Sequence, residues 1–210
     1  MSGIHLALLG MSFGGGLPAI GSAYEGGFFA GQISTAGTGV ADYNLVIAPK
    51  SSGENSSKQW KTSNTSTPGT SSVIDGPTNS ANMNDASHPA AQFCEGFTIG
   101  TFSDWYMPAQ NELEVCYFNL KPTITSNNTG SGTNTNAVPS RGSNYTAGTP
   151  AQTAATDFQT GNTEAFVDSI YWSSTESSTF GRRQDFDGGN QSDGNKSVSF
   201  YVRAVRRVAV

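Results

Sequence analysis

The side chains best suited to chemistry in this sequence are concentrated in one hydrophilic stretch near its C-terminal end. Residues 177–199 mix hydrogen-bond donors, acceptors, both signs of charge and flexible glycines. Proteins commonly place binding groups on such loops, held by a rigid scaffold. We therefore predict a binding surface made of the following side chains: Ser177, Ser178, Thr179, Arg182, Arg183, Asp185, Asp187, Asn190, Gln191, Asp193, Asn195 and Lys196. Phe186 is expected to hold the loop to the body, and a solvated loop without a ligand is the alternative.

A calcium site in the same stretch is a weaker hypothesis. Asp185, Asp187, Asn190 and Asp193 offer oxygen ligands close together in the sequence. Their spacing departs from the EF-hand loop, in which ligand positions are fixed and a glutamate closes the site. We therefore predict no metal site and no cofactor.

Catalytic groups are sparse elsewhere. Zinc is disfavoured because the histidines are His5 and His88 alone and because Cys94 and Cys116 lie far apart in the sequence. Neither histidine lies in a motif typical of a Ser/His/Asp triad. Both cysteines lie on apolar faces of predicted helices, where a thiol is a poor nucleophile. The sequence therefore favours a protein that is not an enzyme.

The elements that would position the binding stretch are short strands and two helices. Residues 27–33 and 43–48 are predicted strands, the second stopped by Pro49. Ser87 is expected to cap a short helix that has Pro89 in its first turn.

A second helix is marked more clearly. It would begin after Pro108 and end before Pro122, and its apolar residues recur at helical spacing from Leu113 to Leu120. After it, residues 122–163 form a polar insertion that we expect to be ordered. Alternation of apolar residues from Val198 to Ala204 predicts a final strand with a bulge at Val205.

Composition limits the class of protein. The chain has 210 residues, of which 35% are hydrophobic and 13% charged, with a net charge of −5. An acidic chain has no general attraction for nucleic acid, and no apolar run is long enough to cross a membrane. Residues 1–22 are apolar and rich in glycine, which suggests an attachment or assembly segment, although a first strand of the same domain is the alternative.

Several motifs occur in an order that resembles a known family. They are DWYMP at residues 104–108 followed by Glu112-Leu113, YWSSTE at 171–176 and YVRAVRR at 201–207, with YEGG at 24–27, LVIAPK at 45–50, Trp60-Lys61 and Asp75-Gly76 before them. Together they resemble the C-terminal domain of bacterial collagen-like adhesins and phage tail fibres. That domain is similar to the C-type-lectin-like fold of formylglycine-generating enzymes and of phage tropism-determining proteins.

The resemblance implies an α+β domain over residues 23–210, loop-rich, with two helices flanking twisted antiparallel strands and with its termini close together. It implies that Trp105 and Trp172 form the core under the loops, and that variable residues would lie from Ser177 to Ser199. Asp104, Glu112, Arg203 and Arg206 look like structural hydrogen-bond and ion-pair partners, as buried carboxylates and guanidinium groups often are. Where relatives place an aromatic residue after the YWSSTE loop, this chain has Gly181-Arg182-Arg183.

Two functional hypotheses follow. In the first, the chain is a phage tail or tail-fibre protein of the virion, assembled in the host cytoplasm, whose C-terminal loops bind a host cell-surface glycan or protein. Residues 1–22, with 122–163, would then form a homotrimer or attach the chain to other tail proteins. In the second, the chain is a structural or decoration protein of the virion and the fold is a scaffold. Neither hypothesis involves nucleic acid or insertion into a membrane.

Overall fold

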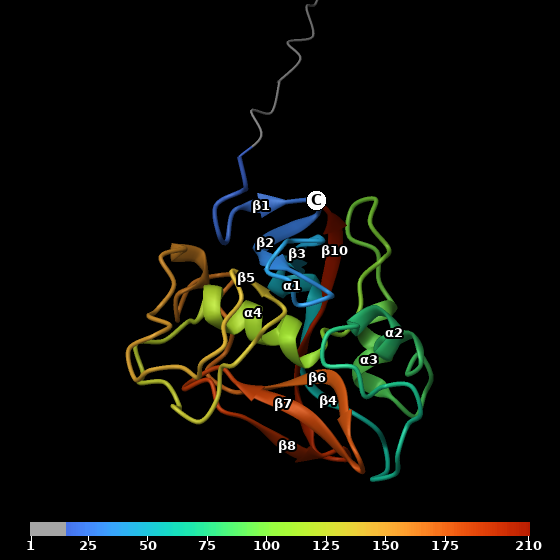
Figure 1. The fold of residues 1–210 in the computed structure, drawn as a ribbon. Coiled ribbons are helices and arrows are strands. Elements are labelled where there is room, and N and C mark those ends of the chain that lie inside the picture. Colours follow the sequence, from blue (N-terminus) through green and yellow to red (C-terminus); the bar gives the residue numbers. More distant parts are fainter. Residues whose placement is uncertain (1–15) are drawn as a thin grey trace, which may run out of the picture.

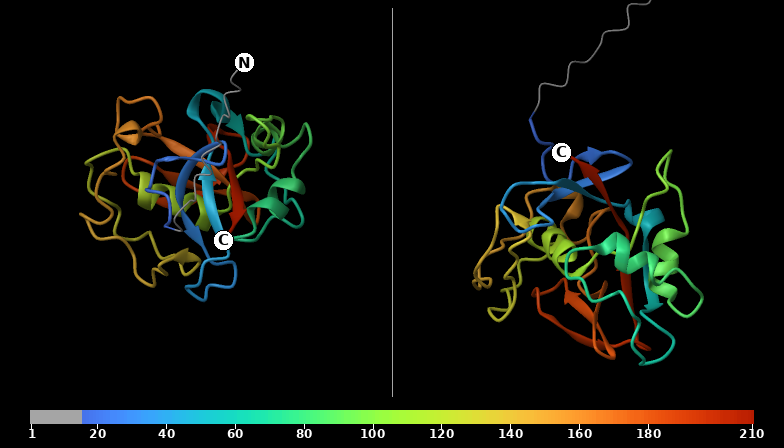
Figure 2. Two further views of the ribbon diagram at one scale, coloured as in Figure 1. Left: turned by 90° about the horizontal axis from the view of Figure 1, so that it is seen from above. Right: turned by 45° about the vertical axis from the view of Figure 1, so that its right-hand side comes forward.

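The computed structural model describes residues 16–210 as a mixed α and β structure in which strands dominate. The strands form two curled, largely antiparallel sheets at opposite ends of the molecule (Figure 1). The helix α4 lies at one side of the sheets, and α2 and α3 lie at the other side (Figures 1 and 2). The predicted α+β class is therefore confirmed. Within residues 16–210, no helix combines the length and the apolar character needed to cross a membrane.

The first sheet joins strands from both ends of the described chain. Its order is β1-β2-β3-β10, and β5 pairs with the end of β2 along the edge that faces away from β3, as β1 does at the start of β2. Its strands are β1 (Ala23–Tyr24), β2 (Gly27–Ile33), β3 (Tyr43–Ile47), β5 (Ala137–Val138) and β10 (Val205–Ala209). The two strands predicted early in the sequence are thus confirmed as β2 and β3, which pair antiparallel.

The second sheet carries the predicted binding stretch. Its order is β4-β9-β6-β7-β8, so β8 is an edge strand. Its strands are β4 (Glu54–Gln59), β6 (Ile170–Ser177), β7 (Phe180–Asp185), β8 (Gln191–Asn195) and β9 (Ser199–Arg203). All neighbours pair antiparallel except β6 and β9, which are parallel where Tyr171 meets Tyr201.

The bulge predicted at Val205 is wrong, because the chain passes there from one sheet to the other. β9 ends at Arg203 in the second sheet and β10 begins at Val205 in the first. Between them Ala204 donates its backbone N–H to Gly53 and accepts one from Ala48, both at 3.0 Å. The guanidinium of Arg203 is fully buried at this crossing. Because the alternation of apolar residues continues from β9 into β10, the sequence suggested a single strand with a bulge.

Arg203 is held at the crossing by oxygen atoms from distant parts of the chain. Its Nε donates to the carbonyl of Ala48 at 2.9 Å, and its Nη2 donates to Oε2 of Glu164 at 2.7 Å. Its Cζ atom lies 4.9 Å from the centre of the Phe166 ring. Arg206 forms a two-pronged pair with Asp104, at 2.7 and 2.9 Å. These arginines are structural partners, as predicted.

The two predicted helices are present. They are α3 (Pro89–Glu95) and α4 (Gln110–Leu120), and the shorter α1 (Lys50–Gly53), α2 (Gly76–Ala81) and 3-10 helix η1 (Thr156–Phe158) complete the set in residues 16–210. Glu112 in the first turn of α4 accepts a hydrogen bond from the backbone N–H of Ala109 at 2.8 Å. The cap predicted for α3 is wrong, because His88 is the N-cap residue and the Ser87 hydroxyl donates to Asp85 instead.

Aromatic side chains form the centre of the molecule. The predicted core residues Trp105 and Trp172 are 2% and 0% exposed, and Trp60 is 0% exposed. Phe186 is also fully buried, which confirms its role in holding the loop to the body. A large buried ring removes much apolar surface from water, so these side chains stabilise the sheet beneath the binding stretch.

The polar segment 122–163 packs on its own domain. Asn136 donates to the carbonyl of Ser34 beside β2 at 2.8 Å, and Asn134 donates to Glu114 on α4 at 2.5 Å. Tyr145 is 5% exposed and lies in the main core cluster. The segment is therefore an integral part of the domain, packed against α4 and the residues beside β2.

The predicted leader at residues 1–22 lies mostly outside the described residues. Its end is part of the domain: Gly21 donates its N–H to Phe29 of β2 at 2.8 Å, and Ile20 packs against the main core cluster.

Candidate functional site

The β7–β8 hairpin rests on two tryptophan rings through two glycines. An added Cβ at Gly194 would lie 2.5 Å from Trp172, and one at Gly181 would lie 2.8 Å from Trp60. The rings occupy the space that side chains would take at both positions. The two rings therefore account for glycine at these positions, because a larger side chain would collide with them.

One predicted binding residue is in the wrong place: Lys196 is 0% exposed. Its ammonium lies 4.1 Å from the centre of the Trp60 ring, 3.1 Å from Oε1 of Glu176 and 3.0 Å from the carbonyl of Thr65. A buried lysine is tolerated here because the carboxylate and the aromatic face replace its hydration. Lys196 therefore holds the hairpin to the domain and faces no solvent.

The exposed end of the hairpin forms what we call the tip surface, consisting of Ser177–Phe180, Arg182, Asp193, Asn195 and Val198. The turn between β6 and β7 is formed by Ser178 and Thr179, and Ser178 has a φ of +58°. Phe180 is 45% exposed and Val198 is 42% exposed, on either side of Asn195, which pairs with Phe180 and accepts the N–H of Val198.

Polar groups on the tip surface are fixed by one another. The guanidinium of Arg182 lies 3.0 Å from Oδ1 of Asp193, and the Ser177 hydroxyl donates to the other oxygen of Asp193 at 3.3 Å. Both members of this ion pair are 39% exposed, so the pair contributes little stability and remains open to a partner. Arg183 lies over the ring of Phe200 at 5.7 Å.

The end of the hairpin that carries the turn between β7 and β8 contacts the segment 122–163. The carbonyl of Asp187 accepts the Thr123 hydroxyl at 2.9 Å, and the N–H of Gln191 donates to Ser131 at 2.9 Å. These contacts separate Asp185, Asp187, Asn190 and Gln191 from the tip surface. The predicted set is therefore split: six of its residues lie on the tip surface and four at the other end, while Lys196 is buried and Arg183 packs on Phe200.

This split also separates the oxygen atoms of the calcium hypothesis. Asp193 of β8 is paired with Arg182 of β7, whereas Asp185 accepts the backbone N–H of Asp187 in the turn between the two strands. In residues 16–210, no group of three or more His, Cys, Asp or Glu side chains is arranged to hold a metal ion. Burial raises the pKa of Asp168, and the nearby charges of Asp187 and Asp185 raise it further.

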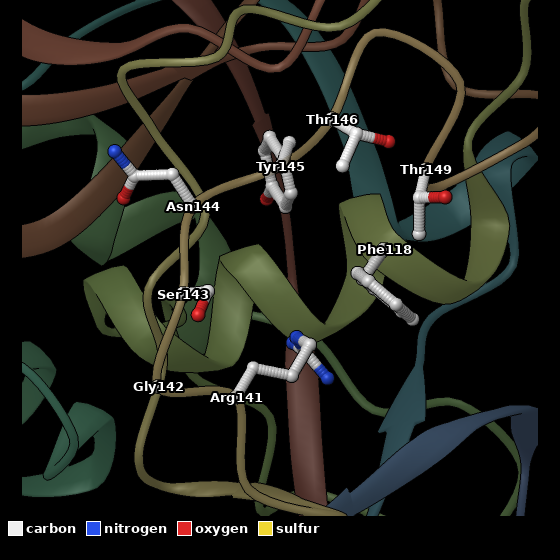
Figure 3. Close-up of a pocket in the computed structure, with 8 residues that line it drawn as sticks. All are labelled: Phe118, Arg141, Gly142, Ser143, Asn144, Tyr145, Thr146 and Thr149. Carbon is white, nitrogen blue, oxygen red and sulfur yellow. The ribbon is translucent and has the colours of Figure 1, made fainter.

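A hollow of about 350 Å³ lies between α4 and the loop 141–149 (Figure 3). It is lined by Phe118, Arg141, Gly142, Ser143, Asn144, Tyr145, Thr146 and Thr149. The Arg141 guanidinium lies 3.9 Å from the centre of the half-buried Phe118 ring. Figure 3 shows these two side chains together at one wall, with Thr146 and Thr149 on the loop beyond them.

The positive charge of Arg141 at this hollow is neutralised by Glu114 of α4. Arg141 donates through Nη2 to the buried carboxylate of Glu114, which also accepts the Tyr145 hydroxyl at 2.8 Å and the amide of Asn134 at 2.5 Å. Burial raises the pKa of Glu114, and the charge of Arg141 opposes that shift. The wall of the hollow thus offers hydrogen-bond donors without a net charge.

A hydroxyl, a histidine and a carboxylate also form a row that the sequence did not suggest. The Thr67 hydroxyl lies 2.9 Å from Nε2 of His88, and Nδ1 of His88 lies 3.0 Å from Asp85. In a hydrolase the hydroxyl faces the substrate and the carboxylate is buried. Here Thr67 is 6% exposed, whereas the Asp85 side chain is 55% exposed. This order of burial suits a structural clasp between the loop 61–70 and α3.

The two cysteines are free and fully buried. Burial raises the pKa of both thiols well above the usual range, and nearby carboxylates add to the effect. Neither thiol is therefore activated as a nucleophile.

Sequence reasoning missed the hollow and the exposed Phe180 and Val198. The hollow lies between α4 and a loop whose sequence has few charges and little hydrophobic periodicity, so no local pattern in the sequence indicates it. Phe180 could have been noticed as an aromatic side chain next to a predicted turn.

No family model, curated protein or solved structure matches the chain.

Proposed function

We propose that this chain is a non-enzymatic recognition protein of a phage tail, with a variant of the C-type-lectin-like fold that displays the tip surface to a host cell. The observation that carries the proposal is the position of the tip surface. β1 and the C-terminus lie at one end of the molecule and the β7–β8 hairpin lies at the opposite end (Figures 1 and 2). A chain attached near its first strand would hold this hairpin outward.

The rigidity of the hairpin supports the same proposal. Its inner face is fixed by glycines against Trp60 and Trp172 and by the buried Lys196. Its outer end combines an exposed aromatic ring with amide, hydroxyl and charged groups. A preorganised surface loses little entropy on binding, and an aromatic residue among polar groups is typical of recognition surfaces.

The ordered motifs from residue 24 to residue 207 support the phage assignment. The partner would be a glycan or protein of the host surface, and other tail proteins would hold the opposite end. A homotrimer is the expected assembly. The buried thiols and the clasp geometry of Thr67, His88 and Asp85 are in keeping with a role other than catalysis.

The test measures adsorption of particles that carry Phe180→Ser together with Asn195→Ala. We expect normal assembly and a loss of adsorption of at least about tenfold, because an exposed aromatic anchor often dominates a binding surface. Val40→Ser is the matched control, since Val40 is 69% exposed in the loop between β2 and β3, away from the tip surface. Unchanged adsorption, or a particle map in which the tip surface is buried against other virion proteins, would overturn the proposal in favour of a structural role.

A further inference from the structure

The strand β10 is an edge of the first sheet, and part of its backbone has no partner in the described chain. Val205 turns away from β3: it donates its N–H to Tyr106 at 3.0 Å and accepts the Tyr106 N–H at 2.9 Å. Because backbone groups alternate in direction along a strand, Arg207 and Ala209 face the same way as Val205. Within residues 16–210, the N–H and C=O groups of Arg207 and Ala209 have no hydrogen-bond partner on this edge. The opposite edge of the sheet differs, because β1 and β5 close it.

The features that usually protect an open edge are missing from β10. Proteins commonly block such edges with proline, a bulge or an unpaired charge. β10 has the sequence VRRVA and pairs with β3 without a shift of register. Its two arginines are neutralised by carboxylates: Arg206 lies 2.7 Å from Asp104, and Arg207 lies 2.8 Å from Glu112. The edge can therefore accept a further strand without burying an unpaired charge.

Exposed apolar side chains lie at this edge. Val210 follows β10 directly and is 71% exposed. Val73 is 43% exposed and precedes Ile74, whose carbonyl accepts a hydrogen bond from the Arg207 guanidinium. A strand bound along β10 would thus remove apolar surface from water as well as pair the free backbone groups.

The segment with matching chemistry is in the same chain, before the described residues. Residues 1–15 contain no Asp, Glu, Lys or Arg, and residues 4–9 read IHLALL. In a strand, Ile4, Leu6 and Leu8 would share one face. The described chain starts at the end of the molecule where the C-terminus also lies (Figures 1 and 2). An uncharged aliphatic segment suits an edge whose own charges are already paired.

Distance favours the edge of a second copy over the edge of the same copy. The strands β2 and β3 separate β1 from β10, so a leader that starts beside β1 would cross four strand spacings, about 19 Å, to reach its own free edge. Residues 10–15 span at most about 20 Å when fully extended. That length leaves nothing for the turn around the sheet, whereas a second copy can bring its β10 to the leader.

We propose that residues 4–9 of one copy pair as an added strand with the free edge of β10 in a second copy, through the backbone groups of Arg207 and Ala209. Such a contact is head-to-tail and closes into a ring when the rotation between copies allows it. The inference goes beyond the proposed function, because it concerns association of the isolated chain. Its failure would leave the adsorption test of the tip surface unaffected.

The test measures the mass of the full chain by sedimentation equilibrium at micromolar concentrations. We expect an oligomer that Ala209→Pro weakens roughly tenfold or more, because proline removes an outward N–H and leaves its acceptor unpaired. The β3–β10 ladder does not use this N–H, and edge strands tolerate proline. Ala209→Ser is the matched control, because it keeps the N–H and should assemble as the unaltered chain does.

The leader is tested by Leu6→Asp/Leu8→Asp, which should also prevent assembly. Its control is Ser2→Asp/Ser12→Asp, which adds the same charge outside residues 4–9 and should leave assembly unchanged. A mixture of the Leu6→Asp/Leu8→Asp chain with the Ala209→Pro chain should form a heterodimer, because one intact leader then meets one intact edge.

Hydrogen exchange keeps the test decisive if Ala209→Pro does not fold. The amides of Arg207 and Ala209 should exchange at least about tenfold more slowly in the unaltered chain than in Leu6→Asp/Leu8→Asp. A monomeric unaltered chain would overturn the proposal, and protected amides in that monomer would indicate pairing within one copy instead. Equal assembly of Ala209→Pro and Ala209→Ser, or no heterodimer in the mixture, would also overturn it.

Discussion

The ammonium of Lys196 lies over the indole of Trp60, 4.1 Å from the ring centre. The same indole packs edge-to-face with the His88 ring, with ring centres 5.7 Å apart. Glu176 completes the site at 3.1 Å from Lys196, and it accepts the backbone N–H of Thr67 and the hydroxyl of Thr70, both at 2.8 Å. One buried cation thus joins the β8–β9 turn, the end of β6 and the loop 61–70.

Replacement of Lys196 by methionine should lower the free energy of unfolding by about 3 kcal/mol, because it leaves the Glu176 carboxylate buried without its cation. Urea unfolding followed by tryptophan fluorescence would measure the loss. The control is Arg182→Met on the same hairpin, which removes a cation from a pair that is 39% exposed and should cost at most about 1 kcal/mol. Equal effects of the two variants would show that Lys196 has no special structural role.

The packing of Gly194 on Trp172 gives a second prediction. Gly194→Ala places a Cβ 2.5 Å from the ring, so the hairpin must shift, and we expect a cost of about 1–3 kcal/mol in unfolding free energy. Gly142→Ala is the control, because an added Cβ there has no atom within 4 Å. Thermal unfolding of both variants checks the prediction, and a Gly194→Ala chain as stable as the control would contradict the packing described.

The elements that the sequence predicts well are those marked by local patterns. Pro108, Pro122 and the spacing from Leu113 to Leu120 predicted α4. The resemblance of the DWYMP and YWSSTE motifs implied the buried Trp105 and Trp172. Each of these signals lies within a few residues of the element concerned.

The errors arose where partners are distant in the sequence. Lys196 stands among Gly, Asn and Ser and looked like a solvated loop residue, but Trp60 and Glu176 enclose it. The crossing at Ala204 could not be distinguished from a bulge, because the alternation of apolar and polar residues does not show which sheet a strand joins. The hollow depends on Arg141 reaching Glu114 on α4, which no local pattern indicates.

The clasp at His88 predicts a dependence of stability on acid. Hydrogen bonds from Ser87, and then from His88, lower the pKa of Asp85 from 3.8 to about 2. A carboxylate with a lowered pKa in the folded state stabilises the fold above the unfolded pKa, and this contribution is lost as the pH falls through about 2. Asp85→Asn should therefore be less stable than the unaltered chain above pH 3.8, and the difference should shrink between 3.8 and 2.

Urea midpoints of both chains across this pH range would measure the effect of Asp85. The difference should be small, since the Asp85 side chain is 55% exposed and solvent screens its charge. Asp75→Asn is a suitable comparison, because it also removes a loop carboxylate, one that caps α2 rather than pairing with a histidine. A difference for Asp85→Asn that does not change with pH would contradict the linkage.

The pair of Glu114 and Arg141 should control the mobility of the loop 141–149. Glu114→Gln removes the charge that anchors Arg141 beneath the hollow, so the loop should open more often and its amides should exchange hydrogen faster under native conditions. Hydrogen exchange measured by mass spectrometry on peptides from 141–149 would detect the change. Glu112→Gln is the control on the same helix, because Glu112 is equally buried but pairs with Arg207 at 2.8 Å. Both variants should be less stable to urea, and only Glu114→Gln should speed local exchange at 141–149; equal exchange in the two would show that the loop is held by its backbone turns instead.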